Sequence, residues 1–366
     1  MKIGIVTITA GTNFGNRLQN YALQSYLEKK GFYVETLIND SKGKITIVGR
    51  IKKLVKKILH IFDIKNKKRE GKFKEFNKKF IKFSKYHVSN DIQEMNNDID
   101  NIFDFFICGS DQIWNPSFDC NAGANFLQFT TPNKRIAYSP SFGVNEIPKR
   151  RVAEIKGYLQ GFKKISVRED AGKHIIEKLT KKKDIDVLID PTMLLTSNEW
   201  SSISKQPTRL SILKEKKYIL NYFLGNLSDT KQKEIIRFAN ENNCEIINLL
   251  DKSDPFYFSG PSEFLWLEKN AFLICTDSFH SSVFAILFNR PFVIFDRDDK
   301  NVSMSSRLEN LLSKFKLNDR KYNGVNITED YLNHDYRDAY KILEKERSKS
   351  ELFINDALYV NKTEQG

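Results

Sequence analysis

The fold is decided by residues 3–38, which read IGIVTITAGTNFGNRLQNYALQSYLEKKGFYVETLI. The apolar run at 3–8 predicts a buried strand, and the apolar residues of 15–29 fall on one helical stripe. Gly31 ends this helix, and residues 33–38 predict the next strand. A strand, a loop of glycine and asparagine, a helix and a second strand together form a βαβ unit.

The same alternation continues through most of the chain. Further strands are predicted at 103–108, 135–139, 164–168, 186–190, 218–224, 245–250, 272–276 and 291–295, with helices between most of them. Apolar strands alternating with helices are typical of parallel sheets covered on both faces. A chain of 366 residues exceeds one ordinary core, so we expect an α/β protein with two Rossmann-like domains facing across a cleft. The domains are predicted at 1–155 and 156–327, followed by a helical tail at 328–366 that can pack back across them.

The net charge of +13 is concentrated in one segment. Residues 50–85 hold 15 lysines and arginines against three acidic residues, a local balance of +12. Nucleic-acid-binding proteins more often carry their charge along a whole face, so no nucleic-acid partner is expected. Helical spacing of Phe73, Phe76, Phe80 and Phe83 predicts a basic helical insertion at about 45–90. This insertion either covers the first sheet with its phenylalanines or contacts an anionic membrane.

Cysteine usage and the lack of membrane signals favour the cytoplasm. Four cysteines occur without a C-x-x-C pair, and two lie in apolar runs, so buried free thiols are expected. The first apolar run is too short for a signal peptide, and no stretch of 18 apolar residues could span a membrane. No metal-binding pattern such as H-E-x-x-H occurs, so neither a metal nor another cofactor is expected.

The first polar loop, TAGTNFGNRLQ at 9–19, follows the first strand. Its glycines permit close backbone approach, and the free N–H groups at the start of the next helix attract anions or hydroxyl oxygens. Asn13 and Asn16 are therefore candidates to bond the hydroxyls of a sugar acceptor. An equally good interpretation is a capped turn with asparagine in left-handed geometry.

The second polar loop, CGSDQIWNP at 108–116, also follows a predicted strand. Asp111 is a candidate general base on an acceptor hydroxyl. Trp114 is a candidate to stack on a sugar ring, and Ser110 is a candidate acceptor contact. The alternative is an aspartate that caps a helix beside a tryptophan in the core.

Two further motifs stand at predicted strand ends. In ISVREDAG at 165–172, Arg168 can grip a carboxylate or phosphate in two places, or it can pair with Glu169 or Asp170. In LIDPT at 188–192, Asp190 before a proline predicts mainly a turn, with lining of the cleft as the second interpretation.

The last motif is CTDSFHSSVFAILFNRPF at 275–292. A buried strand ends at Thr276, and a helix follows with His280 in its first turn, next to N–H groups that lack helical partners. A single histidine in a helix is usually an ordinary half-buried residue. The helix start, the strand end and the polar neighbours make His280 the functional candidate among five histidines.

Together these motifs resemble the polysaccharide pyruvyl transferase family, from Met1 to about Lys316. The resemblance is carried by GTNFGNRLQNYAL, CGSDQIWN, SVREDAG, LIDPTMLL, GPSEFLWL and CTDSFHSSVFAILFNRPF, in this order and spacing. It implies a fold similar to two-domain glycosyltransferases of the B type. It also implies transfer of a pyruvyl group from phosphoenolpyruvate to a sugar of a cell-surface polysaccharide, with formation of a cyclic ketal and release of phosphate.

The resemblance also implies roles for individual residues. The family's donor-binding arginine falls on Arg168, in the domain expected to hold the donor, and its histidine falls on His280. The first domain is then the acceptor side, and the acceptor is a glycan or a lipid-linked sugar. His280 would act as general acid or phosphate partner, with Ser278 and Ser281 beside it in the donor site, and Asp111 as base.

This sequence departs from the family pattern at Ser278, where the family has an arginine. The missing cation is supplied by Arg290, Arg297, Arg307 or a lysine, unless the donor differs. Two other functions therefore stay open: a glycosyltransferase that uses a nucleotide sugar, and a non-catalytic member of the family.

Overall fold

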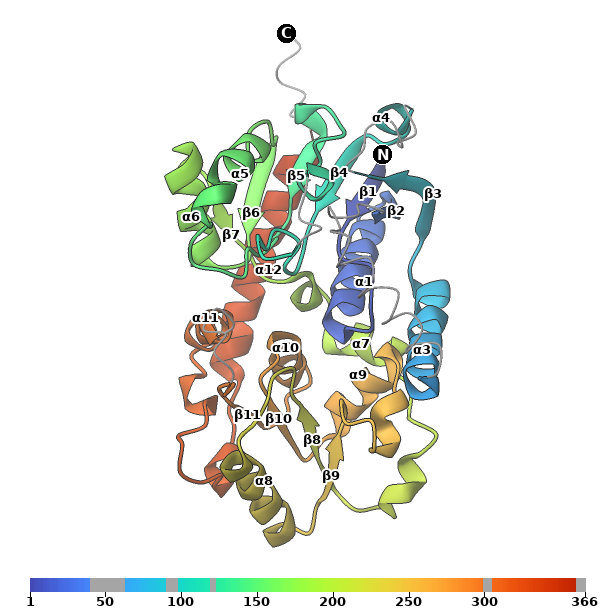
Figure 1. The fold of residues 1–366 in the computed structure, drawn as a ribbon, viewed down its shortest axis with the longest axis vertical. Helices are drawn as coiled ribbons and strands as arrows, with labels where there is room; N and C mark the ends of the chain where they lie inside the picture. Colours follow the sequence, from blue (N-terminus) through green and yellow to red (C-terminus); the bar gives the residue numbers. More distant parts are fainter. Residues whose placement is uncertain (40–62, 90–97, 119–122, 299–304, 360–366) are drawn as a thin grey trace. The chain divides into compact units, whose positions relative to one another are not determined.

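The computed structural model describes residues 1–39, 63–89, 98–118, 123–298 and 305–359 (Figure 1). The chain forms two compact units. The first comprises the described residues of Met1–Leu59, Asn77–Leu194 and Glu344–Gly366, and the second those of His60–Phe76 and Leu195–Leu343.

The first unit is built on a parallel sheet of seven strands in the order β3-β2-β1-β4-β5-β6-β7. The strands are β1 (Lys2–Val6), β2 (Tyr33–Asn39), β3 (Phe83–Val88), β4 (Phe105–Cys108), β5 (Arg135–Ala137), β6 (Lys164–Val167) and β7 (Asp186–Val187). In β1, Ile3 pairs with Val34 on one side and with Phe105 on the other. Central strands buried on both faces are apolar throughout, and the run at 3–8 has this composition.

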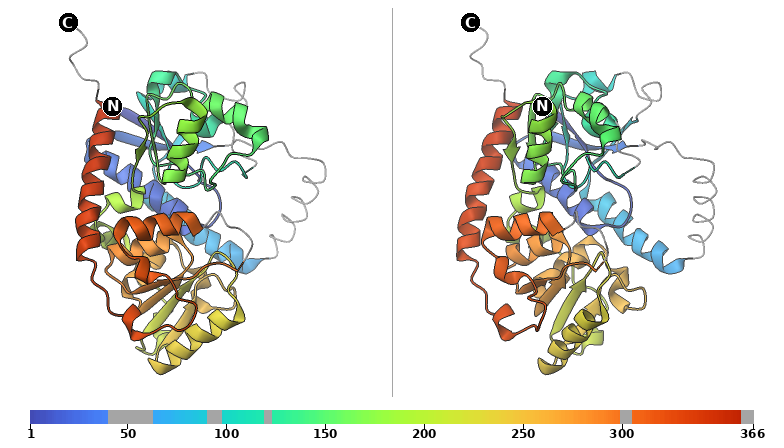
Figure 2. Two further views of the ribbon diagram at one scale, coloured as in Figure 1. Left: turned by 90° about the vertical axis from the view of Figure 1, so that its left-hand side faces the viewer. Right: turned by 60° about the vertical axis from the view of Figure 1, so that its left-hand side comes forward.

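Helices cover both faces of this sheet. They are α1 (Phe14–Lys29), α4 (Ile99–Ile102), α5 (Val152–Tyr158), α6 (Asp170–Thr180) and the last part of α12 (Arg337–Leu358). Val6 and Cys108 pack in one core with Ile155 of α5 and Ile176 of α6. Phe353 of α12 contacts Tyr138, and Figure 2 shows α5 and α6 on one side of the sheet and α12 on the other.

The second unit holds a parallel sheet of four strands in the order β11-β10-β8-β9. The strands are β8 (Tyr218–Tyr222), β9 (Glu245–Asn248), β10 (Leu273–Thr276) and β11 (Phe292–Ile294). Its helices are α7 (Ser197–Ile203), α8 (Asp229–Glu241), α9 (Pro261–Asn270), α10 (Phe279–Leu287), α11 (Ser305–Phe315) and most of α3 (Ile64–Phe80). Ile219, Phe238 and Val293 belong to its core. The predicted α/β fold with two parallel sheets is therefore confirmed.

The basic insertion differs from its prediction. Residues 64–80 form the helix α3, but Phe83 begins the strand β3 and pairs with Thr36 of β2. The alternation in FSKYHV at 83–88 has the period of a strand, and this decides the local structure. Phe73 and Phe76 are buried in the second unit instead of covering the first sheet. Residues 45–62 of the predicted insertion lie outside the described residues.

The division of the chain also differs from the predicted boundary at 155/156. Strand β6 pairs with β5 through Ile136 and Lys164, and β7 pairs with β6, so both extend the first sheet. The first unit therefore runs on to Leu194, and Arg168 belongs to it. A strand that extends a sheet and a strand that starts a new one have the same local pattern, so periodicity does not separate them.

Two sequence expectations concern cysteines and membranes. Cys108 and Cys275 are buried free thiols, as predicted, whereas Cys244 is a free thiol that is only half-buried, and Cys120 lies outside the described residues. Within the described ranges, the helices are all too short or too polar to cross a membrane.

Candidate active site

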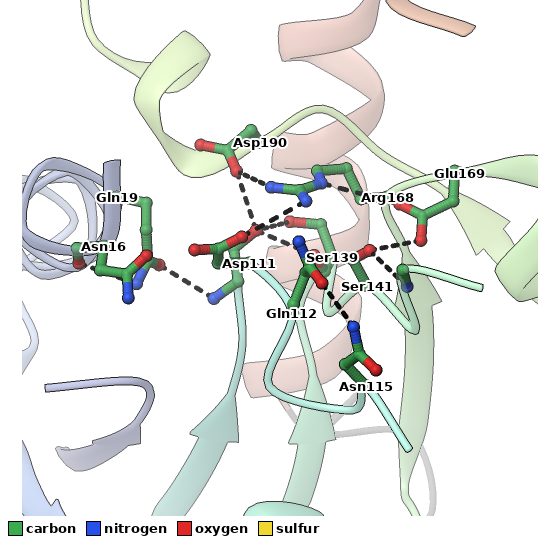
Figure 3. A network of polar contacts seen from close by, with 12 residues as sticks. Asn16, Gln19, Asp111, Gln112, Asn115, Ser139, Ser141, Arg168, Glu169 and Asp190 are labelled. Atoms are coloured by element: carbon green, nitrogen blue, oxygen red, sulfur yellow. Dashed lines mark hydrogen bonds and ion pairs between the residues drawn. The ribbon is translucent and has the colours of Figure 1, made fainter. Parts of the chain in front are cut away.

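The carboxyl edge of the first sheet gathers polar side chains from several loops. Strand β2 flanks β1 on one side and β4 flanks it on the other, so the direction of winding switches between β1 and β4. In parallel sheets, ligands bind in the crevice at such a switch point. Figure 3 shows Asp111, Arg168, Glu169 and Asp190 converging here.

Arg168, directly after β6, is surrounded by three carboxylates. Its Nη1 lies 2.9 Å from Oδ2 of Asp190, its Nη2 3.5 Å from Oδ1 of Asp111, and its Nε 3.7 Å from Oε2 of Glu169. Burial opposes the charge of the guanidinium, but the attraction of Asp190, Asp111 and Glu169 outweighs it and raises the pKa of Arg168. Of the two partners that the sequence alternative named, Glu169 contacts Arg168 and Asp170 is not among its ion-pair partners in the described residues. The closer partners, Asp190 and Asp111, come from distant parts of the chain.

Asp190 is the residue on which this cluster depends. Its side chain is completely buried, and Oδ2 accepts hydrogen bonds from Arg168 Nη1 and from Ser110 Oγ, both at 2.9 Å. Oδ1 accepts from the amide and the hydroxyl of Thr192, at 3.0 and 2.7 Å. The DPT sequence indicates the local turn, but the contacts with Arg168 and Ser110 join distant parts of the chain.

The loop after β4 turns Asp111 toward Arg168. Gly109 has a φ of +127°, and a Cβ there would lie 2.1 Å from the carbonyl oxygen of Tyr138, so only glycine fits. Asp111 follows with a φ of +56° and is largely buried. Ser110, a predicted acceptor contact, is completely buried, and its hydroxyl is shared between Asp190 and the carbonyl of Ser139.

Trp114 belongs to the core, which contradicts its predicted role in stacking on a sugar. Its side chain has no exposed surface, and its ring stacks on Phe126 with centroids 4.8 Å apart. The indole Nε1 donates to the carbonyl of Asn125 at 3.0 Å. A ring closed in on both faces is out of reach of a saccharide.

The loop after β1 is a capped turn, but its asparagines are not left-handed as that interpretation had it: Asn13 is extended, with a φ of −89°, and Gly11 takes the positive φ of +76°. Asn13 is the N-cap of α1, and its Oδ1 accepts from the amide of Asn16 at 3.1 Å. Arg17 donates from Nη2 to the carbonyl of Gly11 at 2.8 Å and from Nη1 to that of Ile8 at 3.3 Å. Burial lowers the pKa of Arg17 to about 10. The sequence interpretation assigned no role to Arg17, which holds the loop closed.

Asn16 keeps an unused acceptor. The residue is 8% exposed, and its Oδ1 has no hydrogen-bond partner within the part of the chain that the structure describes. Gln19, which the sequence did not single out, accepts from the amide of Ser110 at 2.9 Å and donates to Thr7 Oγ1 at 2.7 Å. Gln19 thereby joins the loops after β1 and β4. Among the predicted acceptor contacts, Asn16 fits a sugar hydroxyl best.

The second unit presents the start of α10 at the carboxyl end of β10. Ser278 is the N-cap, with its Oγ 3.5 Å from the amide of Ser281, and its own amide donates to Thr276 Oγ1 at 3.0 Å. His280 stands in the first turn, is 7% exposed, and lies edge-on to Phe279 with ring centroids 5.4 Å apart. The first turn of a helix favours anions through its N–H groups.

The Ser281 side chain points into the interior of the second unit. Its hydroxyl donates to Oε1 of Glu268 on α9 at 2.6 Å, and both side chains are completely buried. Burial raises the pKa of Glu268 well above its ordinary value, with the hydrogen bond from Ser281 opposing this shift. The side chain of Ser281 therefore positions α10 in this structure, in contrast to its predicted contact with the donor.

Asp277 and Arg297 form an ion pair at the same edge of the second sheet. Arg297 Nε lies 2.6 Å from Asp277 Oδ2, and this carboxylate also accepts from the amides of Leu224 and Gly225, each at 2.7 Å. A Cβ on Gly225 would lie 2.5 Å from Arg297 Cδ, so the glycine makes room for the guanidinium. Arg297 thus lies beside Asp277, the residue before the N-cap of α10.

The topology separates the arginines that could replace the family cation. Arg290 precedes β11 and follows the far end of α10, a helix of nine residues that is about 14 Å long. Arg307 is buried on α11. Arg297 follows β11 and therefore shares the sheet edge at which α10 begins.

The predicted site residues are divided between the two units. Asn13, Asn16, Ser110, Asp111, Trp114 and Arg168 belong to the first, and Ser278, His280 and Ser281 to the second. That Arg168 and His280 line one pocket stays a prediction. No group of three or more metal-ligating side chains is placed to hold a metal ion in the described ranges.

The comparisons with known proteins agree on family and fold. A model of the family described as polysaccharide pyruvyl transferase matches residues 13–299. Among the curated proteins, none matches the chain.

Solved structures resemble the chain at low sequence identity. The "putative UDP-N-acetylglucosamine 2-epimerase" of Listeria monocytogenes aligns with a TM-score of 0.50 and 12% identity, over 96% of this chain and 90% of that chain. The UDP-GlcNAc 2-epimerase of Neisseria meningitidis, bound to UDP-GlcNAc, aligns with a TM-score of 0.46 and 10% identity, over 99% and 95%. The first likeness shows the fold alone, and the predicted glycosyltransferase B-type fold is confirmed.

Proposed function

Because the chain belongs to the polysaccharide pyruvyl transferase family, we propose that it transfers a pyruvyl group from phosphoenolpyruvate to a sugar. The acceptor is a pair of hydroxyls in a precursor of a cell-surface or capsular polysaccharide, as a glycan or a lipid-linked sugar. The products are a cyclic ketal and inorganic phosphate. The family match over residues 13–299 carries this proposal.

The reaction balances without an oxidant or a further substrate. The methylene carbon of phosphoenolpyruvate takes up a proton and becomes a methyl group, which leaves a cation at the neighbouring carbon. The two sugar hydroxyls add to that carbon in turn, and the bond to phosphate breaks. The two sugar hydroxyls release two protons in total. One makes up for the proton that the methylene carbon took up, and the other is carried by the released phosphate. The enzyme must therefore hold an anion, deliver a proton and accept protons from hydroxyls.

The start of α10 is the best candidate for the donor phosphate. Its N–H groups favour an anion, His280 stands in the first turn, and Arg297 follows β11 at the same edge. In this proposal Arg297 supplies the cation that the family carries at the position of Ser278. His280 binds the phosphate or delivers the proton to the methylene carbon.

Asp111 is the candidate base, and Arg168 orients it. The Asp111 side chain is 12% exposed, against 5% for Glu169 and none for Asp190, so Asp111 is the most accessible carboxylate of the cluster. The guanidinium of Arg168, 3.5 Å away, fixes the direction of this carboxylate. For Arg168 to grip the donor carboxylate as well, the donor would have to displace one of these acids.

Mass spectrometry of the host glycan tests the proposal. With the wild-type protein, the glycan should carry a mass increment of one pyruvyl ketal, and cells with the His280→Ala variant should lack it. An unchanged glycan mass in cells with and without the protein would contradict the function. Thermal stabilisation by nucleoside diphosphates without any by phosphoenolpyruvate would favour a nucleotide-sugar transferase.

A lysine-rich face of α3 supports a place at the inner face of the membrane, in the cytoplasm. Arg69, Phe73 and Phe76 bury one side of this helix, and Arg69 Nη1 donates to the carbonyl of Tyr257 at 2.7 Å. The opposite side exposes Lys67, Lys74 and Lys78, the "lysine face". Each lysine near an anionic surface contributes about 1 kcal/mol. The proposal includes peripheral binding of this face to anionic lipid, where a lipid-linked acceptor would lie.

A further inference from the structure

The second unit contains a pocket that the proposed reaction does not use. Its volume is about 440 Å³, and it lies at the carboxyl ends of β8 and β9, beside α8. Asn221, Phe223, Gln232, Ile236, Asn248 and Asp251 are among its lining residues. This size is within the range of small-ligand sites, and carboxyl ends of parallel strands are the usual place for them.

The lining disfavours anions. Of the twelve residues that form it, none is basic among those that the structure describes, and the single charged one is Asp251. Hydrogen bonds from the amide and the hydroxyl of Ser253 lower the pKa of Asp251, so the carboxylate is ionised at neutral pH. A phosphate or carboxylate would meet this negative charge, and the nearest cations stand behind the lining: Lys65 acts on Asp251, and Arg297 packs against Gly225 and pairs with Asp277. The lining itself therefore favours a neutral occupant.

Asn221 offers an unused hydrogen-bond acceptor in this pocket. The residue is 9% exposed, and its Nδ2 donates to Asn248 Oδ1 at 2.9 Å. Its Oδ1 is buried and has no hydrogen-bond partner in the described part of the chain. Leaving a buried acceptor without a hydrogen bond is unfavourable, so a ligand that brings a hydroxyl donor would bind more tightly by satisfying it.

The remaining wall is apolar and partly exposed. Ile236 on α8 has 49% of its surface exposed, although it is a large apolar residue beside a pocket. Phe223 also lines the pocket and presents an aromatic ring. Sugar rings combine an apolar C–H face with hydroxyl donors at the rim, so both parts of the lining match one kind of ligand.

We propose that this pocket is a subsite for a neutral saccharide unit of the acceptor glycan. The proposal rests on the proposed function for the identity of the acceptor, but binding at the subsite does not require catalysis. Asn221 Oδ1 accepts from a sugar hydroxyl, and Phe223 and Ile236 pack against the ring. The subsite selects neutral sugars, since Asp251 repels uronic acids and phosphorylated sugars.

Binding to the full-length protein, without phosphoenolpyruvate, tests the subsite. Ligand-observed NMR titrations would use the methyl glycosides of glucose, galactose and N-acetylglucosamine, and separately inorganic phosphate and uridine. We expect at least one glycoside to bind at millimolar concentration and phosphate to leave that binding unchanged. The proposal is overturned if no glycoside binds, whether or not uridine does.

Two variants at the pocket and one matched control locate the binding. Ile236→Trp fills the pocket and should weaken glycoside binding at least tenfold, whereas Lys233→Trp adds the same ring elsewhere on the exposed surface of α8 and should leave it unchanged. Asn221→Leu removes the acceptor and should weaken binding about 3- to 10-fold. Circular dichroism checks that all three variants fold. Equal affinities for the two tryptophan variants would overturn the proposal.

The outcomes for the subsite and for the proposed reaction can be separated. Normal glycoside binding by a protein that never releases phosphate from phosphoenolpyruvate would refute the reaction and leave the subsite standing. Active transfer with an unchanged acceptor KM in the Ile236→Trp variant would refute the subsite alone.

Discussion

Arg168 Nη1 donates to Asp190 Oδ2 at 2.9 Å, and both side chains are buried where the first sheet ends. The two residues are 22 positions apart and come from different loops. This pair fixes the direction of the guanidinium, which in turn faces Asp111 and Glu169. The orientation of the candidate base thus depends on a carboxylate that the substrate does not need to touch.

Replacing Asp190 tests this dependence. Asp190→Asn removes one of three counter-charges and should destabilise the protein by about 1–3 kcal/mol, less than the loss of a sole partner in a buried pair. The measurement is the urea midpoint of unfolding. Glu146→Gln is the control, because it breaks the exposed pair with Lys178 in the same unit and should change stability by less than about 1 kcal/mol. Equal urea midpoints for the two variants would show that the buried Arg168–Asp190 pair contributes no more to stability than an exposed ion pair.

Glu268 predicts a pH dependence of stability. Because burial raises its folded-state pKa above the ordinary value of 4.5, its contribution to stability is fully present below pH 4.5 and is lost as the pH rises toward the folded-state pKa. Glu268→Gln keeps a neutral partner for Ser281 and removes this decline. Thermal unfolding between pH 4.5 and 8 should therefore show the variant gaining on the wild type as the pH rises. Parallel curves for the two proteins would contradict the prediction.

His280 is expected to be required for turnover. His280→Ala should lower kcat for phosphate release from phosphoenolpyruvate at least a hundredfold, in the range of a lost general acid. A coupled phosphate assay with the host glycan extract as acceptor measures it. His174→Ala, an exposed position on α6, is the matched control and should leave the rate near that of the wild type. A wild-type rate for His280→Ala would remove this residue from the mechanism.

Arg297 should act on donor binding. Arg297→Gln removes a charge-assisted contact to the donor phosphate and should raise the KM for phosphoenolpyruvate roughly 10- to 100-fold. Arg290→Gln makes the same chemical change at the amino edge of the second sheet and should leave KM unchanged. The same steady-state assay compares the two. An effect of Arg290→Gln as large as that of Arg297→Gln would refute the assignment of the cation.

The lysine face of α3 should bind anionic vesicles. Sedimentation with vesicles of phosphatidylglycerol and phosphatidylcholine should recover the protein at low salt and release it at high salt, because the attraction is screened. Changing Lys67, Lys74 and Lys78 to glutamine should weaken binding at least tenfold. Lys316, Lys341 and Lys345 are exposed lysines outside α3, and the same triple change there should have a smaller effect. No binding of the wild type at low salt would end the membrane proposal.

The sequence by itself determined the elements and the family. Strand and helix periodicities are local, so the βαβ unit at 3–38 could be predicted, and so could the parallel sheets that follow. The turn at Asp190 and the start of α10 could also be predicted from the sequence. Helix caps and Asx turns involve residues that are at most three positions apart in the chain.

Only the tertiary structure decided what the polar side chains contact. Trp114 occupies the core and Arg168 faces three carboxylates, and in neither case does the surrounding pattern distinguish a ligand contact from a buried partner. The strand β6 extends the first sheet because its backbone pairs with β5, which moves Arg168 out of the unit that holds His280. Pairing and burial depend on residues far apart in the chain, and their free energies are not encoded in local periodicity.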